Sequence, residues 1–182
     1  MLHTTFGLLH RHKACAAGYK KLAKALGGVK VYGQDKPIPL TTILDSNGLS
    51  DTLWCLRATL PEVDVARDKL ARLLACDYAE RALNREREQG REPDPRSWDA
   101  IRVSRAYANG ETTQEELVAA GDAAGAGVGA AGWIAAWAAG ADWVAWAPPA
   151  AWAAAGVAGE GARGGEQEWQ ARRFREYLEG SA

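Results

Sequence analysis

The segment from Gly132 to Ala155 constrains this chain more than any other part of the sequence. It contains five of the eight tryptophans, and these are set almost wholly in alanine. Alanine is the strongest helix former, and tryptophan has the largest apolar surface of any residue. A helix of this composition must bury its tryptophans in its own fold, in a partner or in a membrane.

A membrane span is the least favoured of these three environments, although the segment is long enough to cross a bilayer. Asp142 places a charge near its middle, where the hydrocarbon makes a charge costly. Pro148 and Pro149 interrupt the helix, and alanine is only weakly apolar. We therefore expect no membrane partner.

The tryptophans of this segment fall on more than one side of the expected helix. Trp133 and Trp137 lie on one side, and Trp143 and Trp146 lie on another. We expect the first pair to belong to the core and Trp143 and Trp146 to contact a partner. Two copies of the chain packed tail on tail, as a homodimer, would satisfy the same pattern.

The remaining sequence predicts a series of shorter helices separated by glycine, asparagine and proline. Asp94 followed by Pro95 is a typical helix start, and Thr112 or Thr113 can form a capping box with an acid three residues later. Ser50 is the expected N-cap of a short helix. We expect an all-α fold, a multi-helix bundle of helical hairpins with a long Ala/Trp-rich C-terminal helix. Residues 1–120 would form a helical domain, and residues 121–182 an Ala/Gly/Trp-rich helical tail that packs on it or on a second copy.

The longest predicted helix begins with Thr59 as its N-cap and runs to about Gln89. Its expected apolar stripe is Ala66, Leu70, Leu73 and Leu74, with Tyr78 at the edge. Asp77 and Arg81 lie on this face, within roughly 20° of Leu70 on a helical wheel. They form either an ion pair one turn apart beneath the core or a charged pocket between helices.

An enzyme built around Asp77, Glu80 and Arg81 is a further alternative. The sequence offers it no nucleophile or substrate-binding group, so we expect no catalytic residue and no cofactor.

The N-terminal region is basic, although the whole chain has a net charge of −1. Lys20, Lys21 and Lys24 surround a narrow apolar stripe on a helix that ends at Gly27 and Gly28. This pattern is typical of a solvated amphipathic helix. The alternative is a nucleic-acid-binding accessory protein that contacts phosphates through these three lysines.

Histidine and cysteine give little indication of a metal. His10, His12 and Cys15 have suitable chemistry, but no fourth ligand lies nearby, so we expect no metal site. The three cysteines, Cys15, Cys55 and Cys76, are odd in number and far apart, which indicates free thiols in a reducing compartment. No signal peptide is apparent, and the expected location is the cytoplasm.

Several segments, in order, resemble a family of small Ala/Trp-rich helical proteins of bacteria, phages and prophages. The resemblance rests on IPLTTILDSNGLSDTLWCLRA, LARLLACDYAERAL, AYANGETTQEEL, the Ala/Trp tract and EWQARRFREYLEG. Members are usually described only as immunity-protein candidates or as hypothetical proteins. This chain departs from them in its tail, where relatives tend to interleave Asp and Arg and this sequence has GDAAGAGVGAAG and GVAGEGARGG.

The resemblance implies a non-catalytic, protein-binding inhibitor in phage–host or inter-bacterial conflict. Its partner would be a bacterial protein or ribonucleoprotein complex, either a toxin or a defence effector. The chain would then be a toxin-immunity protein or an anti-defence inhibitor such as an anti-CRISPR. Asp77, Glu80 and Arg81 match the family's most recognisable motif. Together with the tryptophans, which are enriched at binding hot spots, they give the expected partner-binding set Trp143, Trp146, Asp77 and Arg81.

Overall fold

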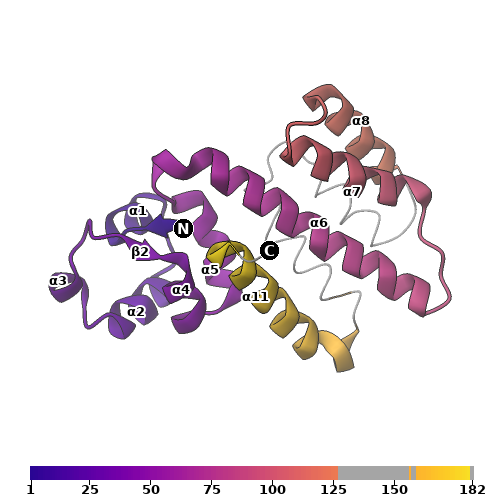
Figure 1. Ribbon diagram of the computed structural model, residues 1–182. Coiled ribbons are helices and arrows are strands. Elements are labelled where there is room, and N and C mark those ends of the chain that lie inside the picture. The colour runs from indigo at the N-terminus through magenta and orange to yellow at the C-terminus, as the bar shows by residue number, and fades with distance from the viewer. Residues whose placement is uncertain (127–155, 157–158, 181–182) are drawn as a thin grey trace. The chain divides into compact units, whose positions relative to one another are not determined.

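The computed structural model describes residues 1–126, 156 and 159–180 (Figure 1). Helices dominate this part of the chain, and its strands are limited to two residues each, so the all-α prediction is confirmed. The predicted Ala/Trp helix, with Trp143 and Trp146, lies outside the described residues.

The chain divides into two compact units. Unit 1 comprises Met1–Arg67 and Ala171–Ala182, and unit 2 comprises Asp68–Gln170. The expected division at residue 120 concerns a tail that is largely undescribed, and it stays a prediction.

Unit 1 is built from short helices around a two-stranded antiparallel ribbon. Strand β1 (His3–Thr4) pairs with β2 (Ile38–Pro39), so that Thr4 lies opposite Ile38. The other elements are α1 (Phe6–Arg11), α2 (Ala16–Ala25), α3 (Val29–Tyr32), α4 (Leu40–Ser46), α5 (Leu49–Cys55) and the 3-10 turns η1 (Leu56–Ala58) and η2 (Pro61–Val63).

The core of unit 1 contains residues from both ends of the sequence. Phe6, Leu22, Ile43 and Leu56 from the N-terminal part are almost fully buried. Phe174, at 0% exposure, and Leu178, at 4%, come from the C-terminal half of helix α11 (Arg163–Glu179). On the surface, Arg175 of α11 forms an ion pair with Asp45 of α4.

Unit 2 is organised on helix α6 (Asp64–Glu88), most of which belongs to it. Helices α7 (Pro95–Ala108) and α8 (Gln114–Gly125) pack against each other. The Cys76 thiol of α6 donates a hydrogen bond to the Ile101 carbonyl of α7 at 3.8 Å. The 3-10 turn η3 (Glu160–Ala162) precedes α11, whose N-terminal half also belongs to this unit.

Helix α6 is buried on more than one side, which the expected single stripe did not anticipate. Leu74 is fully buried, but Leu70 and Leu73 are only half-buried and Ala66 is exposed. The Tyr78 hydroxyl donates to the Gln170 carbonyl of α11 at 3.1 Å, while Cys76 faces α7. A helix covered by two neighbours has no single apolar face, so the one-face wheel placed its stripe wrongly.

Local signals placed several helix ends correctly. Asp94 caps α7 by accepting a hydrogen bond from the Arg96 amide, and Thr113 and Glu116 form the capping box of α8. Other expected caps were wrong. Helix α5 begins after Gly48 instead of at Ser50, and Thr59 precedes η2 instead of capping the long helix.

No helix among the residues that the structure describes is long and apolar enough to cross a membrane.

Candidate functional site

The charged motif of α6 connects this helix to two other helices of unit 2. Asp77 Oδ1 and Glu80 Oε2 both accept hydrogen bonds from Arg105 Nη2 of α7, at 2.7 and 2.5 Å. Arg81 Nε donates to Glu166 Oε2 of α11 at 2.7 Å, and its guanidinium lies 4.3 Å from the centre of the Trp169 ring. The ion pair of Arg81 is therefore made with Glu166 and not with Asp77 one turn away.

Arg105 is a fixed cation. Partial burial acts to lower its pKa, but the hydrogen bonds to Glu80 and Asp77 outweigh this effect and raise the pKa well above the usual arginine value. The side chain still exposes 35% of its surface. Asp77 and Glu80 thus hold a positively charged group in one orientation at the surface of unit 2.

A groove of about 400 Å³ lies beside Arg105 on unit 2. Trp98, Ile101 and Ala106 supply its apolar part, and the Arg87 guanidinium lies 5.9 Å from the centre of the Trp98 ring. Polar and charged side chains supply the rest: Glu80, Arg102, Arg105, Asn109 and Glu111. We call this surface the α7 groove. Its mixture of tryptophan, arginine and a polar rim is typical of protein-binding surfaces.

Glu166 is the centre of a buried polar cluster that the sequence did not predict. Its side chain is 0% exposed and binds Arg81 and Arg85, with Arg85 Nη2 at 2.6 Å from Glu166 Oε2. Gln170 Nε2 donates to the other carboxylate oxygen at 3.2 Å. The spacing contained a signal, because Glu166 and Gln170 precede Phe174 by eight and four residues and therefore share its face of α11.

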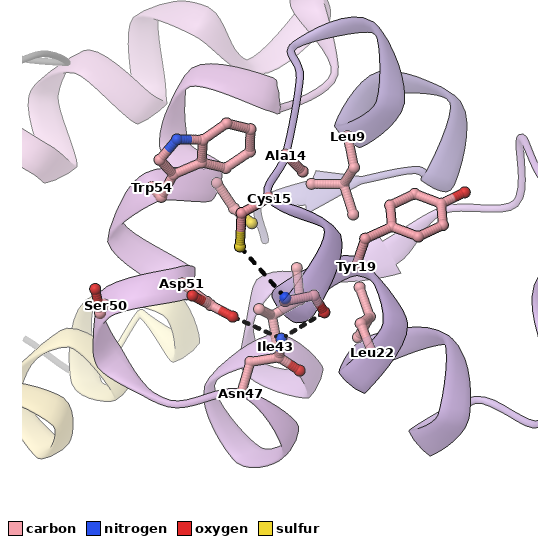
Figure 2. Close-up of a pocket in the computed structure, with 12 residues that line it drawn as sticks. Leu9, Ala14, Cys15, Tyr19, Leu22, Ile43, Asn47, Ser50, Asp51 and Trp54 are labelled. Atoms are coloured by element: carbon pink, nitrogen blue, oxygen red, sulfur yellow. Dashed lines mark hydrogen bonds between the residues drawn. The ribbon is translucent and has the colours of Figure 1, made fainter.

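A second cavity, of about 120 Å³, lies in unit 1 among α1, α2, α4 and α5 (Figure 2). We call it the α2–α5 pocket. Its lining is mainly apolar, and Figure 2 shows the Trp54 and Tyr19 rings to its two sides. The complete lining is Leu9, Ala14, Cys15, Gly18, Tyr19, Leu22, Ile43, Asn47, Ser50, Asp51, Trp54 and Cys55.

The polar side of the α2–α5 pocket is held by hydrogen bonds. Asn47 Nδ2 donates to the Gly18 carbonyl at 2.9 Å and to Asp51 Oδ2 at 2.7 Å. Cys15 Sγ accepts from the Gly18 amide at 3.3 Å. A Cβ atom at Gly18 would lie only 2.6 Å from Asp51 Oδ2, so the carboxylate occupies space that a side chain would fill.

Cys55, which lines the α2–α5 pocket, is buried. Burial, together with the negative charge of Asp51, raises the pKa of the Cys55 thiol to about 12. Cys15, in contrast, is exposed. Sequence reasoning missed this pocket because its walls come from helices whose packing no local pattern specifies.

The other expected contact residues lie apart from these two cavities. Lys20, Lys21 and Lys24 are exposed on α2, as a solvated face or a phosphate-binding face requires, and Lys21 Nζ lies 3.4 Å from the Asn47 carbonyl. His10 and His12 are also exposed. Within the described ranges, no group of three or more His, Cys, Asp or Glu side chains is arranged to hold a metal ion.

No family model, curated protein or solved structure matches this chain.

Proposed function

We propose that this protein binds and inhibits a bacterial toxin or defence effector without catalysis, as a member of the family that its sequence resembles. The observation that carries the proposal is the α7 groove beside the charged motif. Arg105 lines the groove and is held by Asp77 and Glu80, which belong to the motif most typical of that family.

The groove has the chemistry of a binding surface. Tryptophan and arginine are the residues most enriched at hot spots, and Trp98, Arg102 and Arg105 all line it. Because Arg105 is already fixed by two carboxylates, a partner that contacts it does not have to order this side chain. This preorganisation gives Asp77 a role in binding through Arg105. Arg81, which binds Glu166, supports the α6–α11 contact instead.

The enzymatic alternative around Asp77, Glu80 and Arg81 has less support. All three side chains are engaged in ion pairs with Arg105 or Glu166. A general acid or base needs a free orientation toward a substrate group, and these contacts direct the three residues at other protein groups.

The test begins by capturing the partner with the tagged full-length chain from a bacterial lysate and identifying it by mass spectrometry. The purified partner is then mixed with the natural chain, with Trp98→Ala, with Arg102→Ala and with Arg96→Ala. Arg96 and Arg102 are exposed arginines of α7 that each bind a nearby acid, Asp94 or Asp99, but only Arg102 lines the groove.

We expect Trp98→Ala to weaken binding by at least tenfold and Arg102→Ala by a smaller factor, with Arg96→Ala unchanged. Inhibition of the partner should be complete at a fixed molar ratio, because a stoichiometric inhibitor does not turn over. Inactivation that continues at substoichiometric amounts would show catalysis. Unchanged binding by the folded Trp98→Ala variant would exclude the α7 groove.

A further inference from the structure

We propose that the α2–α5 pocket of unit 1 binds the side chain of a lysine that a partner protein inserts. This assignment rests on the proposed protein-binding function, but the pocket shares no residue with the α7 groove. The argument uses its size, its apolar lining and one carboxylate oxygen.

The size and lining suit a straight alkyl chain. A volume of about 120 Å³ corresponds to roughly four water molecules at about 30 Å³ each. Leu9, Leu22 and Ile43 provide aliphatic walls, and Tyr19 and Trp54 provide aromatic ones. The four methylene groups of a lysine would replace water against these walls, and such burial is favourable.

The carboxylate of Asp51 makes the pocket favour a positively charged ligand. Asp51 Oδ2 accepts a hydrogen bond from Asn47, but among the described residues Asp51 Oδ1 has no hydrogen-bond or ion-pair partner. The negative charge of Asp51 acts on the Cys55 thiol more strongly than the positive charge of Arg57 does, because Asp51 raises the pKa of this thiol by more than Arg57 lowers it. The carboxylate would balance the charge of an ammonium group placed at Oδ1. In the pocket, the attraction between these two charges is only weakly screened.

Two cations of the chain, Lys21 and Arg57, contact residues that line the pocket, but they do not pair with Asp51. Lys21 Nζ contacts the Asn47 carbonyl, and the Arg57 guanidinium lies 5.4 Å from the centre of the Trp54 ring. In the part of the chain that the structure describes, neither forms an ion pair with Asp51.

A lysine fits this site better than an arginine. A guanidinium achieves its strongest contact by binding both oxygens of a carboxylate, whereas an ammonium is a compact charge that needs one. Oδ2 already accepts a hydrogen bond from Asn47, and within the described part of the chain Oδ1 is the carboxylate oxygen that accepts none. The same hydrogen bond fixes the orientation of Asp51 before any ligand arrives, which reduces the entropy lost on binding.

The experiment uses small probes and no partner protein. Nα-acetyl-lysine-N-methylamide and the matching norleucine and arginine compounds are titrated into the full chain. Binding is followed by NMR and by the rate at which iodoacetamide alkylates Cys15, the exposed thiol that lines the pocket. We expect the lysine compound to bind at least fivefold more tightly than the norleucine compound and to slow the alkylation of Cys15.

Variants then locate the effect. Asp51→Asn keeps the size of the side chain and an acceptor for Asn47, and it should reduce lysine binding to the norleucine level. Gly18→Ala should act in the same direction, because its Cβ displaces the Asp51 carboxylate. Asp45→Asn removes an exposed acid of α4 that does not line the pocket and should leave binding unchanged.

Equal binding of the lysine and norleucine compounds would overturn the proposal, and this comparison needs no variant that must fold. Full lysine binding by a folded Asp51→Asn variant would also overturn it, and tighter binding of the arginine compound would refute the choice of lysine. A negative result with these probes leaves the α7 groove result standing, since that result depends on Trp98 and Arg102 and on the captured partner.

Discussion

Replacing Glu166 with Gln tests the buried cluster that joins α11 to α6. The substitution preserves the size of the side chain and one acceptor oxygen, but it removes the negative charge that faces Arg81 and Arg85. Because Glu166 is 0% exposed, no water can replace the lost charge at its oxygens. The substitution also places the amide nitrogen of the glutamine against a donor, either the two arginines or Gln170 Nε2, because both carboxylate oxygens are contacted by donors.

The magnitude follows from the contacts. Arg81 donates a charge-assisted hydrogen bond to the carboxylate, which contributes about 1.5–3 kcal/mol, and Arg85 adds an ion pair to the same oxygen. The glutamine retains part of this interaction energy. Arg81 can turn toward water, because 35% of its side chain is exposed. Arg85 has less freedom, because 17% of its side chain is exposed and one guanidinium nitrogen, Nη1, is already buried with no hydrogen-bond partner among the described residues. We expect the free energy of unfolding to fall by about 2–4 kcal/mol, close to the lower end for a broken buried ion pair.

Urea denaturation measures the free energy of unfolding, and hydrogen–deuterium exchange shows where the structure opens. Glu168→Gln is the matched control, since Glu168 lies two residues further along α11 and is exposed. It should change the stability by less than about 0.5 kcal/mol. If the free energies of unfolding of the two variants differ by less than about 0.5 kcal/mol, the buried cluster does not stabilise the α6–α11 contact. The same conclusion follows if the peptides around Arg81 and Gln170 exchange at the natural rate in Glu166→Gln.

Two further predictions concern the thiols and the lysines. Burial raises the pKa of Cys55 to about 12 and that of Cys76 to about 11, so the folded chain keeps these protons above pH 9 while the unfolded chain loses them. The contribution of these thiols to stability is therefore fully present below about pH 9, and the free energy of unfolding should fall above it by about 1.4 kcal/mol per pH unit for each thiol. Urea titrations of Cys76→Ser should show a smaller slope than those of the natural chain, and an equal slope would contradict this reasoning. If α2 binds nucleic acid, fluorescence anisotropy should show an affinity that falls steeply with salt and is lost when Lys20, Lys21 and Lys24 become Glu; absent or salt-independent binding by the natural chain would exclude this alternative.

The features that the sequence predicted well are those that neighbouring residues determine. Asp94 and Pro95 start α7, and Thr113 and Glu116 start α8, because each cap is a contact between residues two or three positions apart. Predictions failed where several local starts compete. Ser50 is a good cap by type, but Gly48, with a φ of 94°, already turns the chain into α5.

Neither cavity nor the partners of the charged motif could be derived in this way. The wheel placed Asp77 and Arg81 on one face of α6, whereas Asp77 binds Arg105 of α7, 28 residues away, and Arg81 binds Glu166 of α11, 85 residues away. The spacing of neighbouring residues carries no information about partners that lie so far away in the sequence. The α2–α5 pocket likewise depends on how four short helices pack, and each of these has ten residues or fewer.

The interleaving of the two units has a consequence for synthesis on the ribosome. Residues 68–170 of unit 2 are made before Phe174 and Leu178, which complete the core of unit 1. The N-terminal 67 residues must therefore wait, with part of their apolar surface uncovered, until the final helix emerges. A nascent chain arrested near residue 170 should hold unit 1 in a protease-sensitive form, and this unit, although it is translated first, should be the last to mature.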